Sequence, residues 1–247
     1  MPPCVRRFER TIPVHVLERE ADLTRTQREG LGKIETLTLL GIAQETTTRI
    51  PATPATDRRI DAVLFVRASL GNTRALESTA TVVHACFPHP SVLILENARG
   101  DVCLSAALTS RRKRATGFAV NAMEADSDIG SWRRTEQGKA FLSSLAFETL
   151  DQRSLAHLTQ DIMARIRLAR VARLVGFYPD PGLCRTPDVV AVIERLLECQ
   201  GRQDRLRARW KAHGTTQRER LRLRIPLSEA IDQTKAAVDE LTRRCGR

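Results

Sequence analysis

The sequence has few aromatic residues, and its cysteines form no paired motif. Aromatic residues make up only 4% of the 247 residues, so aliphatic side chains must fill the core. The six cysteines are scattered without a CxxC pair, a pattern that fits reduced, mostly buried thiols in a cytoplasm. No apolar run approaches the roughly 20 residues of a membrane span, and the N-terminus lacks the apolar stretch of a signal peptide. We therefore expect a soluble, cytoplasmic protein without a membrane partner.

Motifs for common enzyme chemistries are also missing. The chain has no Gly-x-x-x-x-Gly-Lys phosphate loop and no Gly-x-Ser-x-Gly elbow, which disfavours an ATPase or a hydrolase of those kinds. A metal-dependent nuclease would need converging carboxylates, and the core offers only Asp61, Glu96 and Asp101. No Glu-x-Lys or Asp-x-Lys stands on a core strand. The sequence favours a protein without catalytic residues or a cofactor, and a divergent nuclease is an alternative.

One short segment contains several possible metal ligands. His84, Cys86 and His89 lie within six residues, and Cys103 is the only nearby candidate for a fourth ligand. Structural zinc takes four ligands in tetrahedral geometry. A helix end that leads into a core strand explains these residues without a metal, so we predict no metal site.

Lysine is scarce, but positive charge is not. Only five of the forty basic residues are lysine, and the formal net charge is +11 with a pI near 10.2. A surplus of this size favours a polyanionic partner such as nucleic acid. An arginine-rich composition can also reflect a GC-rich coding genome, so the position of the charge matters more than its sum.

Three aliphatic runs form the predicted core of an α+β fold. Ile60–Arg67, Ser91–Glu96 and Val102–Thr109 read as strands with little solvent exposure on either face. Apolar residues at helical spacing predict a helix over Asn72–Phe87, with Asn72 as its N-cap. Residues 97–101 supply turn chemistry between the second and third strands. The prediction is a small mixed β-sheet with flanking helices.

The flanking segments divide the chain into three parts. Residues 1–57 are predicted as an extended arm followed by a helix over Asp22–Leu40, in which Thr24 and Gln27 have capping-box spacing. Residues 58–178 are the α/β core, which ends in a second helical region over Gln137–Val175. The proline-rich segment Phe177–Pro187 marks a boundary before the C-terminal part, residues 188–247.

Heptad spacing predicts an antiparallel coiled-coil helical hairpin over residues 188–247. The first arm has apolar positions from Val189 to Trp210, and the second, after Gly214 and Pro226, has Leu227, Ile231, Thr234, Val238, Leu241 and Cys245. Residues 202–224, around the predicted turn, contain nine basic residues and two acidic ones. The alternation of arginine with Leu221, Leu223 and Ile225 also permits an extended segment there.

Two basic segments are therefore predicted to contact nucleic-acid phosphates without base specificity. The candidates in the hairpin are Arg205, Arg209, Lys211, Arg218, Arg220, Arg222 and Arg224. A second run follows the third core strand and consists of Arg111, Arg112, Lys113 and Arg114, which can equally be a solvated turn that protects a sheet edge. For docking on a partner protein, the candidates are Val189, Leu196, Leu206 and Trp210.

The order of several segments resembles a bacterial and archaeal family of uncharacterised function. The matching residues are Arg10-Thr11-Ile12-Pro13, Phe87–Glu96 with its Pro-His-Pro step, Trp132, and the hairpin over Val189–Leu241. Members of that family are typically encoded beside a helicase and a site-specific DNA methyltransferase in restriction-like phage-defence islands. They often carry a Glu-x-Lys ending on the first core strand, where this chain has Phe65-Val66-Arg67. The departure disfavours nuclease activity.

Charge and resemblance together predict a non-catalytic accessory subunit of a DNA-processing anti-phage defence complex. Its partners are expected to be DNA, bound through the backbone, and a helicase or DNA methyltransferase subunit. One alternative is a scaffold subunit without direct DNA contact, and another is the divergent nuclease. The sequence leaves open the choice between DNA and RNA, the protein partner and the oligomeric state.

Overall fold

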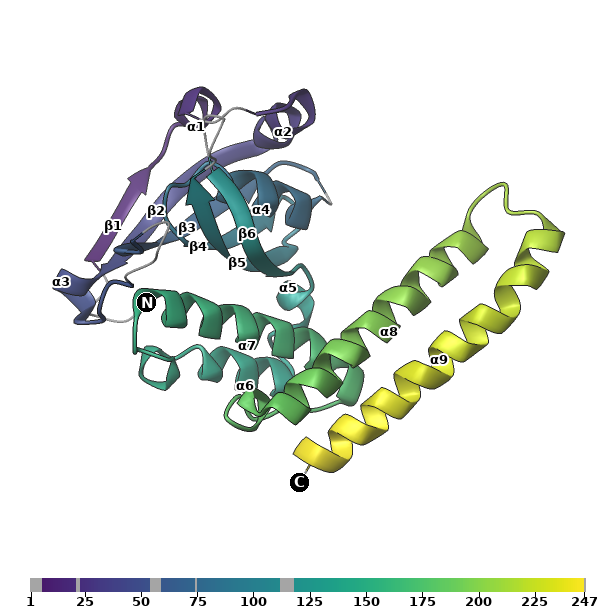
Figure 1. The fold of residues 1–247 in the computed structure, drawn as a ribbon. Coiled ribbons are helices and arrows are strands. Elements are labelled where there is room, and N and C mark those ends of the chain that lie inside the picture. The colour runs from purple at the N-terminus through teal and green to yellow at the C-terminus, as the bar shows by residue number, and fades with distance from the viewer. Residues whose placement is uncertain (1–5, 21–22, 54–58, 74, 112–117, 247) are drawn as a thin grey trace. The chain divides into compact units, whose positions relative to one another are not determined.

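The protein is represented by a computed structural model, which describes residues 6–20, 23–53, 59–73, 75–111 and 118–246 (Figure 1). The chain divides into two compact units, Met1–Ala169 and Arg170–Arg247. The first unit contains a six-stranded mixed sheet with flanking helices, and the second contains a helical hairpin. The predicted α+β fold is therefore confirmed.

The sheet of the first unit has its strands in sequence order. They are β1 (Arg6–Thr11), β2 (Ile34–Gln44), β3 (Ala62–Leu70), β4 (Ser91–Asn97), β5 (Val102–Arg111) and β6 (Phe118–Asp126). All neighbouring strands are antiparallel except β3 and β4, which are parallel. Helix α4 (Leu76–His84) makes the crossover that a parallel pair requires. The predicted order of strand, helix, strand and hairpin in the core is confirmed.

Helices and short turns complete the first unit. They are α1 (Val14–Glu20), α2 (Arg25–Leu31), α3 (Glu45–Thr48), α5 (Ile129–Trp132), α6 (Glu136–Ser144), the 3₁₀ helix η1 (Phe147–Thr149) and α7 (Leu155–Val175), whose last residues belong to the second unit. No helix among the described residues combines the length and the apolarity needed to cross a bilayer.

The core of the first unit is aliphatic, as the scarcity of aromatic residues predicts. Leu37, Leu70, Leu93 and Leu95 are fully buried, and they belong to a cluster that includes apolar residues of α2 and α4. Strand β3 is buried along most of its length, with only Arg67 exposed. This burial confirms the prediction that the first core strand has little solvent exposure on either face.

His84, the last residue of α4, is fully buried against the sheet, and both of its ring nitrogens contact serine hydroxyls of β4 and β5. Nδ1 lies 2.7 Å from Ser91 Oγ, and Nε2 lies 2.9 Å from Ser105 Oγ. The Ser105 hydroxyl donates its hydrogen to the Glu124 carbonyl at 3.0 Å, so it must accept from Nε2–H. Nδ1 is then the acceptor of the Ser91 hydroxyl. The network holds a neutral imidazole with hydrogen on Nε2.

The predicted helix over Asp22–Leu40 is wrong in its second half. Helix α2 has the expected Thr24/Gln27 capping box, but it ends at Leu31 with Gly32 as its C-cap. From Ile34 the chain is strand β2, which pairs with β1 on one side and β3 on the other. Ladder pairing on both edges outweighs the helical spacing of the leucines. Residues 6–11, predicted as an extended arm, and residues 34–40, predicted as helix, therefore belong to the sheet.

Two other helix predictions differ in detail. Asn72 does not cap α4, because the helix begins only at Leu76, and its Oδ1 instead accepts a hydrogen bond from Arg99 Nε at 2.7 Å. The helical region predicted over Gln137–Val175 is broken into α6, η1 and α7. The break lies at residues 145–154, where Asp151 and Ser154 make hydrogen bonds with side chains instead of continuing a helix.

The second unit consists of the 3₁₀ helix η2 (Leu183–Arg185) and two long helices, α8 (Pro187–Lys211) and α9 (Gln217–Cys245). Helices α8 and α9 lie side by side as an antiparallel hairpin (Figure 1). At 1.5 Å per residue they are about 37 and 43 Å long. Both begin with helix-start signals, Pro187 in the first turn of α8 and a Thr216/Glu219 capping box at α9.

Candidate nucleic-acid interface

The seam between α8 and α9 agrees with part of the heptad prediction in each arm. Thr234, Leu241 and Cys245 of α9 are buried as predicted, whereas Cys199, Leu206 and Trp210 of α8 are only half-buried. Val189, Val192, Leu196 and Gln203 of α8 are buried, as their heptad positions predict. In α9 the buried residues are Leu223, Ala230, Thr234, Ala237, Leu241 and Cys245. Ala230 and Ala237 thus replace the predicted Ile231 and Val238, which are only half-buried. Small side chains at the seam let the two helices approach closely.

The second arm also begins earlier than we predicted. Helix α9 starts at Gln217, and Pro226 lies inside it rather than before it. The alternating segment Arg220–Ile225 is therefore helical, and the extended alternative is wrong. Residues 212–216 join the helices, with Gly214 at a φ of +109°, a backbone conformation that favours glycine.

The helical start of α9 brings the predicted hairpin arginines together at one end of the hairpin. We call residues 202–224 the hairpin tip. All seven predicted phosphate contacts in it are exposed: Arg205, Arg209, Lys211, Arg218, Arg220, Arg222 and Arg224. Among the described residues, no carboxylate oxygen lies within 4.0 Å of a nitrogen of these seven side chains. Within the described part of the chain, the charge of the tip is therefore not neutralised at contact distance.

The helix dipoles separate the tip arginines into two groups. Arg209 and Lys211 lie in the last turn of α8, where the helix dipole favours cations, so helix stability alone accounts for them. Arg218 and Arg220 lie in the first turn of α9, where the same dipole opposes cations. Arg218/Arg222 and Arg220/Arg224 are also like-charged i,i+4 pairs, each of which destabilises a helix by roughly 0.2–0.5 kcal/mol. Helix stability does not explain the α9 arginines.

The start of α9 is held by one acidic residue among these cations. Glu219 N–H donates to Thr216 Oγ1 at 3.2 Å, and Thr216 N–H donates to Glu219 Oε2 at 2.8 Å. The hydrogen bonds from Thr216 lower the pKa of the Glu219 carboxyl, with a smaller contribution from the charges of Arg209 and Arg222. Glu219 is thus committed to the capping box and does not form an ion pair with the arginines.

Removal of this cap is expected to loosen the first turn of α9. Thr216→Ala leaves the Glu219 N–H without its acceptor, which typically costs about 1 kcal/mol. Hydrogen exchange of the amides at residues 217–220 should then be about fivefold faster. Thr216→Ser is the matched control, because it retains the hydroxyl acceptor. Equal exchange in the alanine and serine variants would show that the cap does not hold the helix start.

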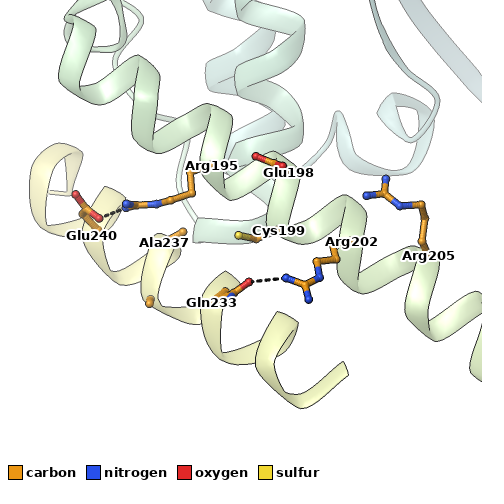
Figure 2. Close-up of a pocket in the computed structure, with 9 residues that line it drawn as sticks. Arg195, Glu198, Cys199, Arg202, Arg205, Gln233, Ala237 and Glu240 are labelled. Carbon is orange, nitrogen blue, oxygen red and sulfur yellow. Dashed lines mark hydrogen bonds and ion pairs between the residues drawn. The ribbon is translucent and has the colours of Figure 1, made fainter. Parts of the chain in front are cut away.

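A groove of about 540 Å³ lies between α8 and α9, and Arg202 and Arg205 of the tip line one part of it (Figure 2). Arg195 of α8 forms an ion pair with Glu240 of α9, and Arg202 Nη1 donates to Gln233 Oε1 at 3.4 Å. Bonding to Arg195 lowers the pKa of Glu240. The Arg195–Glu240 ion pair therefore matches charge at the end of the groove away from the tip, whereas Arg202, a tip residue, is bonded to a neutral amide.

The predicted partner-binding residues do not form an exposed surface. Leu196 is fully buried and Val189 is buried, so neither side chain is available to another protein in this structure. Leu206 and Trp210 are half-buried. The heptad pattern that suggested a docking face reflects burial within this molecule instead.

The second predicted basic run lies mostly outside the described residues. Arg112, Lys113 and Arg114 fall in the segment that the structure does not describe. Arg111 is the last residue of β5, and its backbone pairs with Phe118 at the start of β6. The two strands are antiparallel neighbours, as the predicted hairpin requires.

Of the three acidic residues considered for a nuclease, Asp61 lies far from the other two. Glu96 of β4 is opposite Ser69 of β3, and Asp61 precedes Ser69 by eight residues along the strand direction. At about 3.3 Å per residue, Asp61 and Glu96 are roughly 26 Å apart. Glu96 forms an ion pair with Arg67 at 2.8 Å, and Asp101 accepts a hydrogen bond from Asn97 at 2.9 Å. These carboxylates do not share a site.

The residues considered for a metal site are arranged for other contacts. His84 is bonded to two serines, and Cys86 Sγ donates to the Val82 carbonyl at 3.3 Å. Burial raises the pKa of Cys86 and of Cys103 to about 12, which disfavours the thiolate that metals bind. Among the described residues, no three His, Cys, Asp or Glu side chains gather around a point where an ion would fit.

Comparison with known proteins places the chain in a family. Residues 3–230 match the family described as "Domain of unknown function (DUF4391)". The chain belongs to the DUF4391 family. No curated protein and no solved structure matches it.

The DUF4391 match extends through the sheet, the whole of α8 and the first part of α9. The hairpin tip, at residues 202–224, is therefore part of the DUF4391 region. The sheet and the basic end of the hairpin are features of one family domain.

Proposed function

We propose that this protein is a non-catalytic accessory subunit of a DNA-processing defence complex, and that its hairpin tip contacts the nucleic-acid backbone. The observation that carries the proposal is the placement of Arg218 and Arg220 in the first turn of α9, where the helix dipole opposes them. A bound polyanion would neutralise these charges and relieve the repulsion. The proposed partner proteins are a helicase and a site-specific DNA methyltransferase, on the family resemblance described above.

The composition of the tip supports phosphate contact rather than base reading. Guanidinium groups bind phosphate oxygens through paired N–H donors, and contacts of this kind fix position without selecting sequence. The α9 arginines are exposed and have no carboxylate within 4.0 Å among the described residues. Their binding to a phosphate therefore does not require an internal ion pair to break.

The proposal is tested by removing three of the α9 charges in the full chain. Arg218→Gln/Arg220→Gln/Arg224→Gln retains good helix formers, so α9 should still form. DNA affinity, measured by fluorescence anisotropy at about 0.1 M salt, should fall roughly a hundredfold. The slope of log K against log salt should decrease in magnitude by about 2.7, because each lost duplex phosphate contact contributes about 0.9.

A matched control separates local contact from net charge. Arg28→Gln/Arg133→Gln/Arg134→Gln removes three exposed positive charges from the first unit. It should leave the salt slope unchanged and lower the affinity only slightly. If the control weakens binding as much as the α9 variant, or if the α9 variant binds as well as the parent, the tip is not the contact.

A further inference from the structure

The same turns of α9 expose two large aliphatic side chains. Leu221 is 62% exposed and Ile225 is 69% exposed, the highest values for large apolar side chains among the described residues. They flank Leu223, which is only 8% exposed and belongs to the buried seam. At about 100° per residue, positions two before and two after Leu223 point roughly 160° away from it. Neither side chain therefore contributes to packing in the seam between α8 and α9.

Leu221 and Ile225 share their face of the helix with two of the tip arginines. Arg218, Leu221, Arg222 and Ile225 occupy positions i, i+3, i+4 and i+7, which lie on one face of an α-helix. We call these four residues the Leu221 face. It presents aliphatic carbons directly beside guanidinium groups. A matching ligand must offer negative charge and an apolar surface within the same few ångströms.

The size of this face decides between possible partners. Two aliphatic side chains fall far short of the roughly 800 Å² per partner that a stable protein interface buries. They are also too few to anchor a membrane, since a single myristoyl chain with many more methylenes binds only marginally. Insertion between bases needs only one or two apolar side chains, because the flanking cations hold the phosphates.

We propose that Leu221 and Ile225 insert between nucleic-acid bases that are already unstacked, while Arg218 and Arg222 hold the adjacent phosphates. This inference rests on the proposed function and adds a ligand class to it, nucleic acid with unpaired bases. Unstacking an intact base step costs a few kcal/mol, so a site where bases are already unpaired binds the same face more tightly. The charge of the tip then determines the affinity for any nucleic acid. Leu221 and Ile225 determine the preference for nucleic acid with unpaired bases.

The test compares two fluorescent DNA probes, an intact duplex and the same duplex with unpaired nucleotides at its centre. The full chain should bind the bulged probe at least about tenfold more tightly, because the cost of unstacking a base step is then already met. Leu221→Ala/Ile225→Ala should reduce this preference to near unity and leave the salt slope on the intact duplex unchanged. Alanine is suitable at both positions because it favours the helix and neither side chain is buried.

The matched control is Leu142→Ala/Leu183→Ala, which removes two other exposed leucines and should retain the preference. Equal affinity of the parent for both probes, or an unchanged preference in the Leu221 and Ile225 variant, overturns the inference. If the arginine-dependent binding persists in that case, the proposed function survives. If the parent binds neither probe, the proposed function fails as well. Sedimentation with phosphatidylserine vesicles that depends on Leu221 and Ile225 would instead assign the face to a membrane and also overturn the inference.

Discussion

Replacing Arg165 by alanine is expected to lower the free energy of unfolding of the first unit by about 3–5 kcal/mol. Arg165 is only 3% exposed, and its ion-pair partner Asp161, one turn earlier in α7, is 7% exposed. Both Nε and Nη2 of Arg165 donate to Asp161 Oδ2, at 3.1 and 2.9 Å. Without the guanidinium, Asp161 is a buried charge that has lost its cation, and this loss dominates the effect.

The same guanidinium also fixes the segment between α6 and α7. Its Nη1 donates to the carbonyl of Ser144 and to Thr149 Oγ1, and its Nη2 donates to the carbonyl of Thr149. The Asp161 carboxylate accepts the Asp151 backbone N–H at 3.0 Å. The Arg165 side chain thus donates hydrogen bonds to polar groups between α6 and α7, a segment with little regular structure. Its removal leaves several of them unsatisfied at once.

The measurement is urea denaturation of the full chain, followed by Trp132 fluorescence in a Trp210→Phe background so that only the first unit is observed. Arg153→Ala is the matched control, because Arg153 forms a 2.7 Å ion pair with Asp151 but is largely exposed. Its loss should have a much smaller effect, since solvent screens a surface pair. A loss for Arg165→Ala no larger than that of Arg153→Ala would contradict the assigned role.

The sequence contained a signal for this pair, but not for its burial. Asp161 and Arg165 have the i,i+4 spacing of a helical ion pair. In the sequence, Arg165 stands with Arg167, Arg170 and Arg173 near the end of a helical region, where the helix dipole favours cations, and this explains its charge without burial. Arg165 is buried because residues 144–151 return to its side chain, and no local pattern encodes that long-range packing.

At strand β2 the sequence did contain a local pattern, but that pattern predicted the wrong secondary structure. The leucines and isoleucine of residues 31–40 fit a helical stripe, and the chain follows that pattern only as far as Gly32. Beyond it, β2 gains backbone pairing from β1 and β3 on both edges. Such pairing depends on strands far apart in the sequence and outweighs weak helix propensity. The core strands were predictable because their apolar runs are short and uninterrupted.

The hairpin was predictable as a pair of helices, but only half of the seam in its second arm was, namely Thr234, Leu241 and Cys245. Heptad rules favour large aliphatic residues at the seam, whereas Ala230 and Ala237 occupy it in α9. The charge of residues 202–224 could be counted from the sequence. The unfavourable position of Arg218 and Arg220 in the first turn of α9 could not be predicted. It depends on the helix beginning at Gln217 instead of after Pro226. The same early start exposes Leu221 and Ile225 as one face.

Acidification is expected to destabilise the first unit through His84. Burial lowers the pKa of His84 from 6.5 to about 3 in the folded state. As the pH falls below 6.5, the unfolded chain binds a proton on this imidazole, but the folded chain does not. Stability contributed by the neutral ring is therefore full above pH 6.5 and decreases by about 1.4 kcal/mol per pH unit down to about pH 3. Over the whole window the loss approaches 5 kcal/mol.

Other groups also titrate in this range, so the test compares two chains at each pH. His84→Gln is less stable at neutral pH because the Ser91 and Ser105 hydroxyls lose a well-placed partner. It has no titrating group at this position, so its stability should depend less on pH. The difference in unfolding free energy between the two chains, followed by Trp132 fluorescence in the Trp210→Phe background, should shrink by about 2 kcal/mol from pH 6.5 to about pH 5. Parallel pH curves would mean that His84 takes up its proton in the folded state, and the assignment of a neutral ring between Ser91 and Ser105 would be wrong.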